Sequence, residues 1–519
     1  MCRGPESPVR AEPPELLARQ PPPRGRLRRA GRWLGRCARR WLCLRRLLLI
    51  ALAVAAALAA WVYVQDTVAW RAALRKQGFV DEMPAPAAAD RIVVFAPHPD
   101  DETLACGGLI QQALQNGARV DVVLMTNGDA AEMALVFGEK DIFVSPKAMI
   151  GLGETRQGET LKALGRLGLP AARVHFLSYP NNGLTELWRP AHWYPQDRYS
   201  SPYTHTAVSP YARSVTPHAV YCGQGVLADV TSVLQRLRPN KVFLSHPKDA
   251  HPDHWATDCF VQYGLATLRA RGEEWAGEAE MYGYLVHWTR FPEPARVSVD
   301  TDLLPPADLT SVQSRWLRLD LPHEMAHRKL QAIRDYQSQL PQVDRFLLKF
   351  GRGNETFEQL LPQTGSLATP TRWPDRGGHR YHLGGAELDA LELMVTPAGE
   401  RAKPDGHASA KLVNGGRQLK KRSFIALDLR AWDAGGAPVV VEVVVQPRGA
   451  ARATRAMGGA VTTQPVMLYP GAKDLSLNFR VPAELLTKKG LFLSCWGSLK
   501  EVDAVVATTV LPEGLGTGG

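Results

Sequence analysis

The sequence predicts an α/β domain with a doubly wound, mostly parallel sheet, preceded by a transmembrane helix and followed by a β-sandwich-like domain. The chain has 519 residues, which is more than a single compact core usually holds, so several parts are expected. In its middle part, strand-like apolar runs alternate with helix-like stretches, which is typical of a parallel sheet covered by helices. Its last part contains only short strand-like runs, which favours a sandwich.

The N-terminal tail, residues 1–46, is strongly basic. It holds thirteen arginines, no lysine and three glutamates, and so carries about +10 of the net charge of +11. The rest of the chain is close to neutral, which argues against a nucleic-acid-binding surface on the folded part. The seven cysteines are scattered and include no C-x-x-C pair, so no disulfide framework is predicted.

Residues 47–64 predict one transmembrane helix. These eighteen residues carry no charge, and as a helix they span roughly 27 Å of hydrocarbon at about 1.5 Å per residue. Arg45 and Arg46 directly precede the helix, so the positive-inside rule places the N-terminus in the cytoplasm and everything after residue 65 outside it. The alternative is a cleaved signal peptide, because "ALA" at 57–59 resembles a cleavage site.

A linker rich in proline and small residues, 65–90, leads to the α/β domain at 91–361. The strand-like runs of this domain lie at 91–97, 119–126, 173–177, 240–245 and 281–287, and its helix-like stretches at 103–116, 154–168, 224–238, 255–271 and 323–339. A loop-like second linker covers 362–384, the β-rich domain covers 385–512, and residues 513–519 form a tail.

Polar side chains follow two of the predicted strands. "HPDDE" at 98–102 comes directly after the first strand, and "HPKDAHPDH" at 246–254 follows the fourth. Because the carboxyl ends of parallel strands meet at one edge of a sheet, and ligands bind there, the two clusters should converge. A zinc site needs about three ligands from His and Asp or Glu and an open position for water. His98, Asp101 and His254 supply such a set.

Each cluster has an alternative interpretation when it is considered alone. "HPDD" could begin a helix, with Asp100 or Asp101 capping its free amide groups. "HPDH" at 251–254 could form a solvated turn in a loop and bind no metal. The position of both clusters behind strands of one predicted sheet favours the metal site.

The motifs "APHPDDETLACGG" and "HPKDAHPDH" resemble those of the LmbE-like and PIG-L-like N-acetylglucosaminyl deacetylases. The resemblance covers about residues 90–360. It implies an LmbE-like fold and one zinc ion per chain, or another divalent metal in its place, held by His98, Asp101 and His254. It also implies that Asp100 is the general base and that His251 steadies or protonates the collapsing intermediate.

The chemistry of these residue types agrees with the roles that the resemblance implies. A carboxylate that does not bind the metal, such as Asp100, can take a proton from water, and an imidazole such as His251 can protonate a departing amine. An alternative role for His251 is to orient His254 or Asp253.

Three further residues, Asn127, Arg156 and Asn181, are candidate sugar contacts by the same resemblance. Many relatives carry an aspartate where this chain has Asn181. For Arg156 the alternative is an i,i+3 surface pair with Glu159.

The segment after Gly183 is long, rich in aromatic residues and without helical or strand period. Long structureless insertions in compact domains are usually functional loops. Trp188 and Trp193 are therefore predicted to stack on sugar faces, and the alternative is that these rings only pin the loop to the core.

Together these features predict a membrane-anchored, extracytoplasmic, zinc-dependent hydrolase that removes the acetyl group from an N-acetylated amino sugar of the GlcNAc type. The expected partners are an envelope glycan, polysaccharide or glycolipid, the membrane through a single helix, and glycan-assembly proteins through the C-terminal domain; nucleic acid is not among them. The alternatives are a non-catalytic envelope scaffold and a zinc amidohydrolase of a different amide. The complete set of ligands and base disfavours the scaffold.

Overall fold

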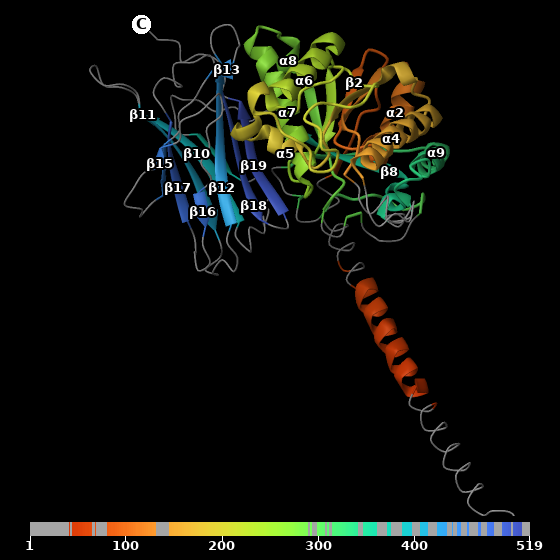
Figure 1. Cartoon of the computed structure of the whole chain (residues 1–519). Coiled ribbons are helices and arrows are strands. Elements are labelled where there is room, and N and C mark those ends of the chain that lie inside the picture. Colours follow the sequence, from red (N-terminus) through yellow and green to blue (C-terminus); the bar gives the residue numbers. More distant parts are fainter. Residues whose placement is uncertain are drawn as a thin grey trace, which may run out of the picture. The chain divides into compact units, whose positions relative to one another are not determined.

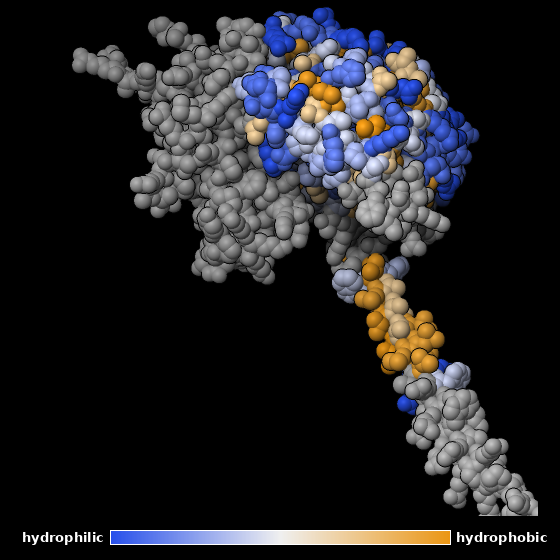
Figure 2. Space-filling view, viewed as in Figure 1, coloured by the Kyte–Doolittle hydropathy of each residue, from blue (hydrophilic) through white to orange (hydrophobic). Residues whose placement is uncertain are grey.

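The computed structural model describes residues 44–64, 80–130, 145–288, 298–306, 314–340 and 346–360, a few single positions beside them, and the strands of the C-terminal part. The chain forms two compact units, Met1–Gln65 and Asp66–Gly519. In the first unit, one helix, Leu44–Val64, is long and apolar enough to cross a membrane, with a mean hydropathy of 2.6. Figure 2 shows this helix as a hydrophobic segment. The helix is confirmed, and its insertion into a membrane stays a prediction.

The α/β domain of the second unit is built on an eight-stranded sheet in the order β1-β7-β8-β6-β5-β2-β3-β4. Five strands form its parallel part, and all five were predicted to within a few residues: β2 (Arg91–Ala96), β3 (Arg119–Thr126), β4 (Val174–Tyr179), β5 (Lys241–Ser245) and β6 (Glu280–Tyr284). The mostly parallel sheet is therefore confirmed.

The remaining three strands extend this sheet beyond β6 and were not predicted. They are β8 (Asn354–Leu360), β7 (Trp316–Asp320) and β1 (Val80–Glu82). β8 pairs antiparallel with both β6 and β7, and β1 pairs parallel with β7. The sheet is thus mixed, and β1 lies in the segment that the sequence assigns to the first linker.

Helices cover both faces of the sheet (Figure 1). One face carries α2 (Asp101–Gln115), α4 (Pro146–Arg166) and α9 (His323–Ile333), and the other carries α5 (Leu184–Trp188), α6 (Gly223–Leu237), α7 (Pro252–Ala270) and the short α8 (Trp275–Glu278). Side chains of β2 alternate between the two cores, with Val93 and Phe95 in one and Val94 and Ala96 in the other. This alternation follows from the period of two in a strand that is buried on both faces.

The order of the strands reverses beside β2. The chain runs from β2 to β3 and β4 on one side and then returns to β5 on the other side. In doubly wound sheets, ligands bind outside the carboxyl ends of the strands at such a switch point. The motif at 98–102 follows β2 and the motif at 246–254 follows β5, so the topology brings the two motifs together.

The strands of the C-terminal part form two sheets. The first has the order β15-β14-β17-β11-β10-β9, and the second consists of β13, β12, β18 and β19, with β16 paired to β12. Their strands are β9 (Thr371–Pro374), β10 (Glu387–Thr396), β11 (Asp405–Val413), β12 (Ser423–Trp432), β13 (Pro438–Val439), β14 (Val444–Pro447), β15 (Thr454–Arg455), β16 (Val466–Leu468), β17 (Leu475–Val481), β18 (Gly490–Leu499) and β19 (Val502–Val510). All their pairings are antiparallel. The packing of a sandwich stays a prediction.

Candidate functional site

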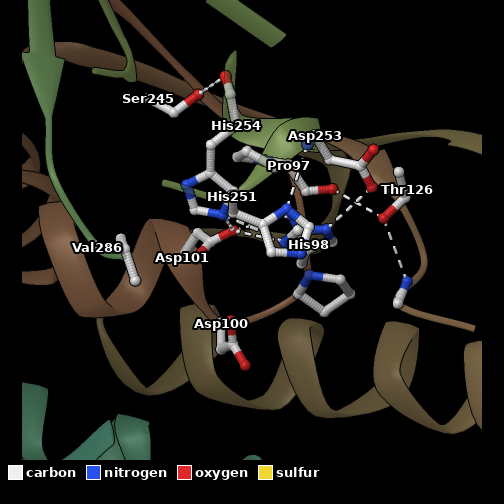
Figure 3. Close-up of polar contacts among 12 residues, drawn as sticks. Pro97, His98, Asp100, Asp101, Thr126, Ser245, His251, Asp253, His254 and Val286 are labelled. Atoms are coloured by element: carbon white, nitrogen blue, oxygen red, sulfur yellow. Dashed lines mark hydrogen bonds and ion pairs between the residues drawn. The ribbon is translucent and has the colours of Figure 1, made fainter. Parts of the chain in front are cut away.

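The predicted ligand residues meet at the carboxyl ends of β2 and β5. His98 lies in the loop after β2, Asp101 is the first residue of α2, and His254 lies in the first turn of α7. The Oδ2 atom of Asp101 is 3.2 Å from His98 Nδ1 and 3.1 Å from His254 Nε2, and these two nitrogens are 3.3 Å apart. Figure 3 shows the three side chains directed at one another.

These three separations fit a tetrahedral metal site. Zinc binds His nitrogens and carboxylate oxygens at about 2.0–2.2 Å, so two ligand atoms of a tetrahedron lie roughly 3.4 Å apart. The observed 3.1–3.3 Å is close to that edge length. Three donors leave the fourth position open, as in catalytic rather than structural zinc sites.

The outer nitrogens of both histidines face buried carboxylates. His98 Nε2 is 3.2 Å from Asp253 Oδ2, and His254 Nδ1 is 3.2 Å from Asp249 Oδ2. Asp253 also accepts the backbone N–H groups of Asn182 and Leu184, at 2.6 and 3.1 Å. Metal-binding histidines commonly turn their second nitrogen to a carboxylate in this way.

The proton on each neutral ring therefore belongs on the nitrogen that faces the outer carboxylate. The lone pairs of His98 Nδ1 and His254 Nε2 then point at each other and at Asp101 Oδ2. Three acceptor atoms this close repel one another unless a proton or a metal cation lies between them. The residues therefore fit a zinc ion or a similar divalent metal.

The charges at the centre also favour a cation. Without a metal, a proton can supply the positive charge: burial acts to lower the pKa of His254, but the Asp101 and Asp249 carboxylates outweigh it and hold that pKa well above its usual value. Burial acts to raise the pKa of Asp101, but His254 and His98 hold it well below the usual range. Asp101 is thus ionised, as a metal ligand must be.

Asp100 lies outside the group of three ligands, and Figure 3 shows its carboxylate away from them. Its backbone has φ 125° and ψ −35°, a conformation that non-glycine residues rarely adopt. Its N–H bonds the Glu102 carboxylate at 3.1 Å, and its Oδ2 lies 3.2 Å from Arg156 Nη2. Burial raises the pKa of Asp100 to about 8, although Arg156 acts to lower it.

His251 caps the N-terminus of α7. Its Nδ1 accepts the backbone N–H of Asp253 at 3.2 Å, and its ring lies edge-on to that of His98 with centroids 4.5 Å apart. Burial and the neighbouring His98 and His254 hold the pKa of His251 well below its usual value. The ring is therefore neutral, and Nε2 carries its proton. His251 thus supports Asp253, as in the alternative interpretation, and still offers an N–H group beside the ligands.

The three candidate sugar contacts lie at the same edge of the sheet or beside Asp100. The buried Asn127 follows β3, and its Oδ1 lies 3.1 Å from Gln157 Nε2. Its Nδ2 has no partner in the part of the chain that the structure describes. Asn181 follows β4, and its side chain accepts the N–H of Asn182 at 2.9 Å. Asn127 is thus a buried donor available to a ligand.

Arg156 contacts Asp100 and not Glu159. Its guanidinium donates to the carbonyl groups of Pro99 and Gly128, at 2.6 and 3.0 Å. A Cβ atom at Gly128 would lie 1.9 Å from that guanidinium, so this position requires glycine. Glu159 instead bonds Ser338. The i,i+3 surface pair that the sequence left open is therefore not formed.

The predicted stacking of Trp188 and Trp193 on sugar is wrong. Both side chains are fully buried. Trp188 lies edge-on to Phe260 of α7 with ring centroids 4.9 Å apart, and Trp193 lies parallel to the same ring at 6.3 Å. The insertion is also not structureless, because it contains α5 and the short 3-10 helices Pro190–His192 and Pro195–Asp197. Its tryptophans attach it to the core, which is the alternative stated above.

Another histidine of the second motif, His246, does not belong to the centre. It stacks on Trp316, and its Nε2 lies 2.6 Å from Glu358 Oε2. The contact with Glu358 joins the end of β5 to β8.

His287, in contrast, lies near the centre but was not predicted as a site residue. Its ring centroid lies 4.8 Å from that of His254, and ligand atoms of Asp101, His254 and His287 lie within 4.8 Å of one another. Its place at the end of the strand-like run 281–287, shortly after β6, was the signal that could have pointed to it.

Comparisons with known proteins agree with the geometry. The family model described as "PIG-L: GlcNAc-PI de-N-acetylase" matches residues 93–263. A 1D-myo-inositol 2-acetamido-2-deoxy-alpha-D-glucopyranoside deacetylase of Tsukamurella paurometabola is 26% identical over 273 residues, which are 48% of this chain and 83% of the relative. A protein of the same description from a Mycobacterium species is 32% identical over 169 residues, 32% of this chain and 47% of the relative.

Solved structures match the chain more weakly. The N,N'-diacetylchitobiose deacetylase from Pyrococcus horikoshii has a TM-score of 0.32 and 19% identity, covering 52% of this chain and 83% of its own. Similarity at this level carries no conclusion about the reaction.

Proposed function

We propose that the chain is a zinc-dependent deacetylase that acts on an N-acetylated amino sugar of the GlcNAc type. The match of residues 93–263 to the PIG-L family model and the similarity to curated deacetylases support this proposal. The observation that carries the metal assignment is the convergence of His98 Nδ1, Asp101 Oδ2 and His254 Nε2 at 3.1–3.3 Å. A zinc ion bound there would supply Lewis-acid polarisation of the amide carbonyl and lower the pKa of a water molecule.

Asp100 is the proposed general base. It is adjacent to a ligand but contacts Arg156 instead of the metal centre, so its carboxylate is free to accept a proton. Burial raises the pKa of Asp100 to about 8. A divalent cation nearby would lower this pKa toward neutral pH. Such a pKa suits a base at physiological pH.

His251 is proposed to steady the collapsing intermediate. Its ring is neutral and its Nδ1 accepts the amide of Asp253, so its Nε2–H group can donate a hydrogen bond to the intermediate, while the proton that Asp100 takes from water would pass to the departing amine. Asn127 Nδ2 and Asn181 are the proposed contacts for sugar oxygens, because Asn127 holds an unpaired buried donor and Asn181 lies at the neighbouring strand end.

The proposed substrate is part of an envelope glycan, polysaccharide or glycolipid, and the chain is proposed to be a single-pass membrane protein with its catalytic domain outside the cytoplasm. The apolar helix Leu44–Val64 and the arginine-rich tail support this proposal. Glycan-assembly proteins remain proposed partners of the C-terminal domain.

The test is to screen the full chain in detergent against a panel of N-acetylated glycans and free N-acetyl sugars, with release of primary amine as the readout. Activity should disappear when zinc is removed by a chelator and return when zinc is added back. Full activity in metal-free protein would exclude this mechanism. Cleavage of non-sugar amides alone would favour an amidohydrolase of another substrate.

A further inference from the structure

Asp249 is a buried carboxylate to which the proposed reaction assigns no role. It lies in the loop between β5 and α7 and is 1% exposed. Its Oδ1 accepts the backbone N–H of His251 at 3.0 Å, and its Oδ2 accepts those of Val286 and His287, both at 2.8 Å. A carboxylate that accepts several backbone N–H groups is held in its ionised form.

The same Oδ2 atom lies 3.2 Å from Nδ1 of His254, which is ion-pair distance, although the two groups are not aligned as a hydrogen bond in this geometry. An ionised carboxylate has no proton to donate, so when the His254 ring is neutral, as a metal ligand must be, its proton belongs on Nδ1. The lone pair of Nε2 is then directed at Asp101 Oδ2, 3.1 Å away. We propose that Asp249 is a positioning residue that fixes the tautomer and the ring orientation of His254 for metal binding, an inference that rests on the proposed zinc-dependent function.

Asp249 can do this because two loops hold it in place. Its bonds to Val286 and His287 attach it to the segment after β6, and the carbonyl of His287 in turn accepts the N–H of Ala250 at 2.7 Å. The backbone of His254 is held separately, since Ser245 Oγ donates to its carbonyl at 2.6 Å. With its backbone held, His254 can still rotate its ring. The contact with Asp249 limits this rotation.

Asp258 provides a matched control. It lies one turn after His254 in α7 and is fully buried. Its carboxylate accepts a hydrogen bond from Gln262 Nε2 at 2.7 Å. Its side chain makes no contact with the ligand side chains in the described part of the chain. Replacing Asp258 removes a buried carboxylate from the same helix without touching the metal centre.

The experiment compares the full-length chain with Asp249→Asn, Asp249→Glu and Asp258→Asn. Zinc affinity is measured by chelator competition, and the geometry of the centre by the visible absorption of the cobalt-substituted protein. Asp249→Asn should weaken zinc binding about 10- to 100-fold, the loss usual for a partner of a metal-binding histidine, and alter the cobalt spectrum. Asp249→Glu keeps the charge but displaces it, so it should alter the spectrum with a smaller loss of affinity.

Asp258→Asn should keep the affinity and the spectrum of the unmodified chain. The inference is overturned if Asp249→Asn lowers only thermal stability and leaves the zinc affinity and the cobalt spectrum unchanged. It is also overturned if Asp258→Asn lowers the zinc affinity as much as Asp249→Asn does. If Asp249→Asn does not fold, Asp249→Glu decides by the same two measurements. Failure of the unmodified chain to bind zinc or cobalt would overturn the proposed function itself, which is a distinguishable result.

Discussion

Asp100 and Asp101 are consecutive carboxylates that take different positions. The unusual backbone of Asp100, with φ 125°, turns the chain between them. Asp101 then faces His98 and His254, whereas Asp100 lies against Arg156. The sequence predicted that both lie near a metal, and resemblance assigned their roles. Asp100 takes its separate position through contacts with Arg156 and Glu102. These contacts could not be predicted, because they depend on distant or unusually oriented segments of the chain.

Replacing Asp100 by Asn should separate metal binding from turnover. The variant should keep about one equivalent of zinc, because its side chain lies outside the group of three ligands, while turnover falls by a factor of roughly 10² or more, as for a lost general base. Zinc content and amine release measured on the same preparation check this. Loss of the metal would show that Asp100 is needed for binding and that its assignment as base alone is wrong.

Replacing His254 by Ala should remove zinc and activity together, since one of three ligands is lost. The control is His246→Ala, a histidine of the same motif that bonds Glu358 away from the centre. That variant should lose stability but keep its zinc when folded. Equal zinc contents in the two variants would contradict the ligand assignment.

At the scale of elements, the sequence predicted the five strands of the parallel part and the five longer helices, but not the short α5 and α8 or the strands β1, β7 and β8. β8, with the sequence NETFEQL, has five buried residues at its start although most of them are polar. Glu355 pairs with Lys329 and Glu358 with His246, both inside the domain. Because partners across the fold neutralise these side chains, a pattern of apolar residues cannot reveal the strand. The tryptophans of the insertion were misjudged for the opposite reason, since aromatic rings are typical of both binding surfaces and cores.

Glu355 should be a major contributor to the stability of the domain. Its carboxylate accepts the N–H groups of Gly108 and Leu109 of α2, at 2.7 and 2.8 Å, and lies 2.6 Å from Lys329 Nζ. Glu355→Gln leaves the Lys329 charge buried without its partner, which should cost about 3–5 kcal/mol. Thermal and denaturant unfolding, followed by tryptophan fluorescence, measure this loss.

The matched control for that prediction is Asp302→Asn, which breaks a partly exposed pair with Arg318. Exposed pairs contribute about 0–1 kcal/mol, so this change should be small. The double variant Glu355→Gln with Lys329→Met should recover part of the loss, because no buried charge remains. Similar losses for Glu355→Gln and Asp302→Asn would show that the buried pair does not stabilise the domain.

At the scale of the whole molecule, the arginine-rich tail and the helix Leu44–Val64 predict the orientation in the membrane. A reporter that is active only outside the cytoplasm should work when fused after residue 80, and a reporter active only in the cytoplasm should fail there. The reverse result would place the catalytic domain in the cytoplasm. The substrate would then be sought among soluble nucleotide sugars or thiol precursors.

The C-terminal sheets should serve recognition of the substrate and not its hydrolysis, because all the proposed ligands and the base lie between residues 98 and 254. The strand pairing decides where the chain should be shortened to test this. Because β9 pairs with β10, ending the chain near residue 375, within the second predicted linker, would divide a sheet. Ending the chain after residue 361 leaves β8 intact. The shortened chain should still hydrolyse a small soluble N-acetylated sugar and should act more weakly on the native glycan. Amine release from both substrates, with zinc content as a check of folding, measures the two effects. Equal losses on both substrates would make the C-terminal part a structural support of the catalytic domain, and unchanged activity on both would contradict a role in recognition.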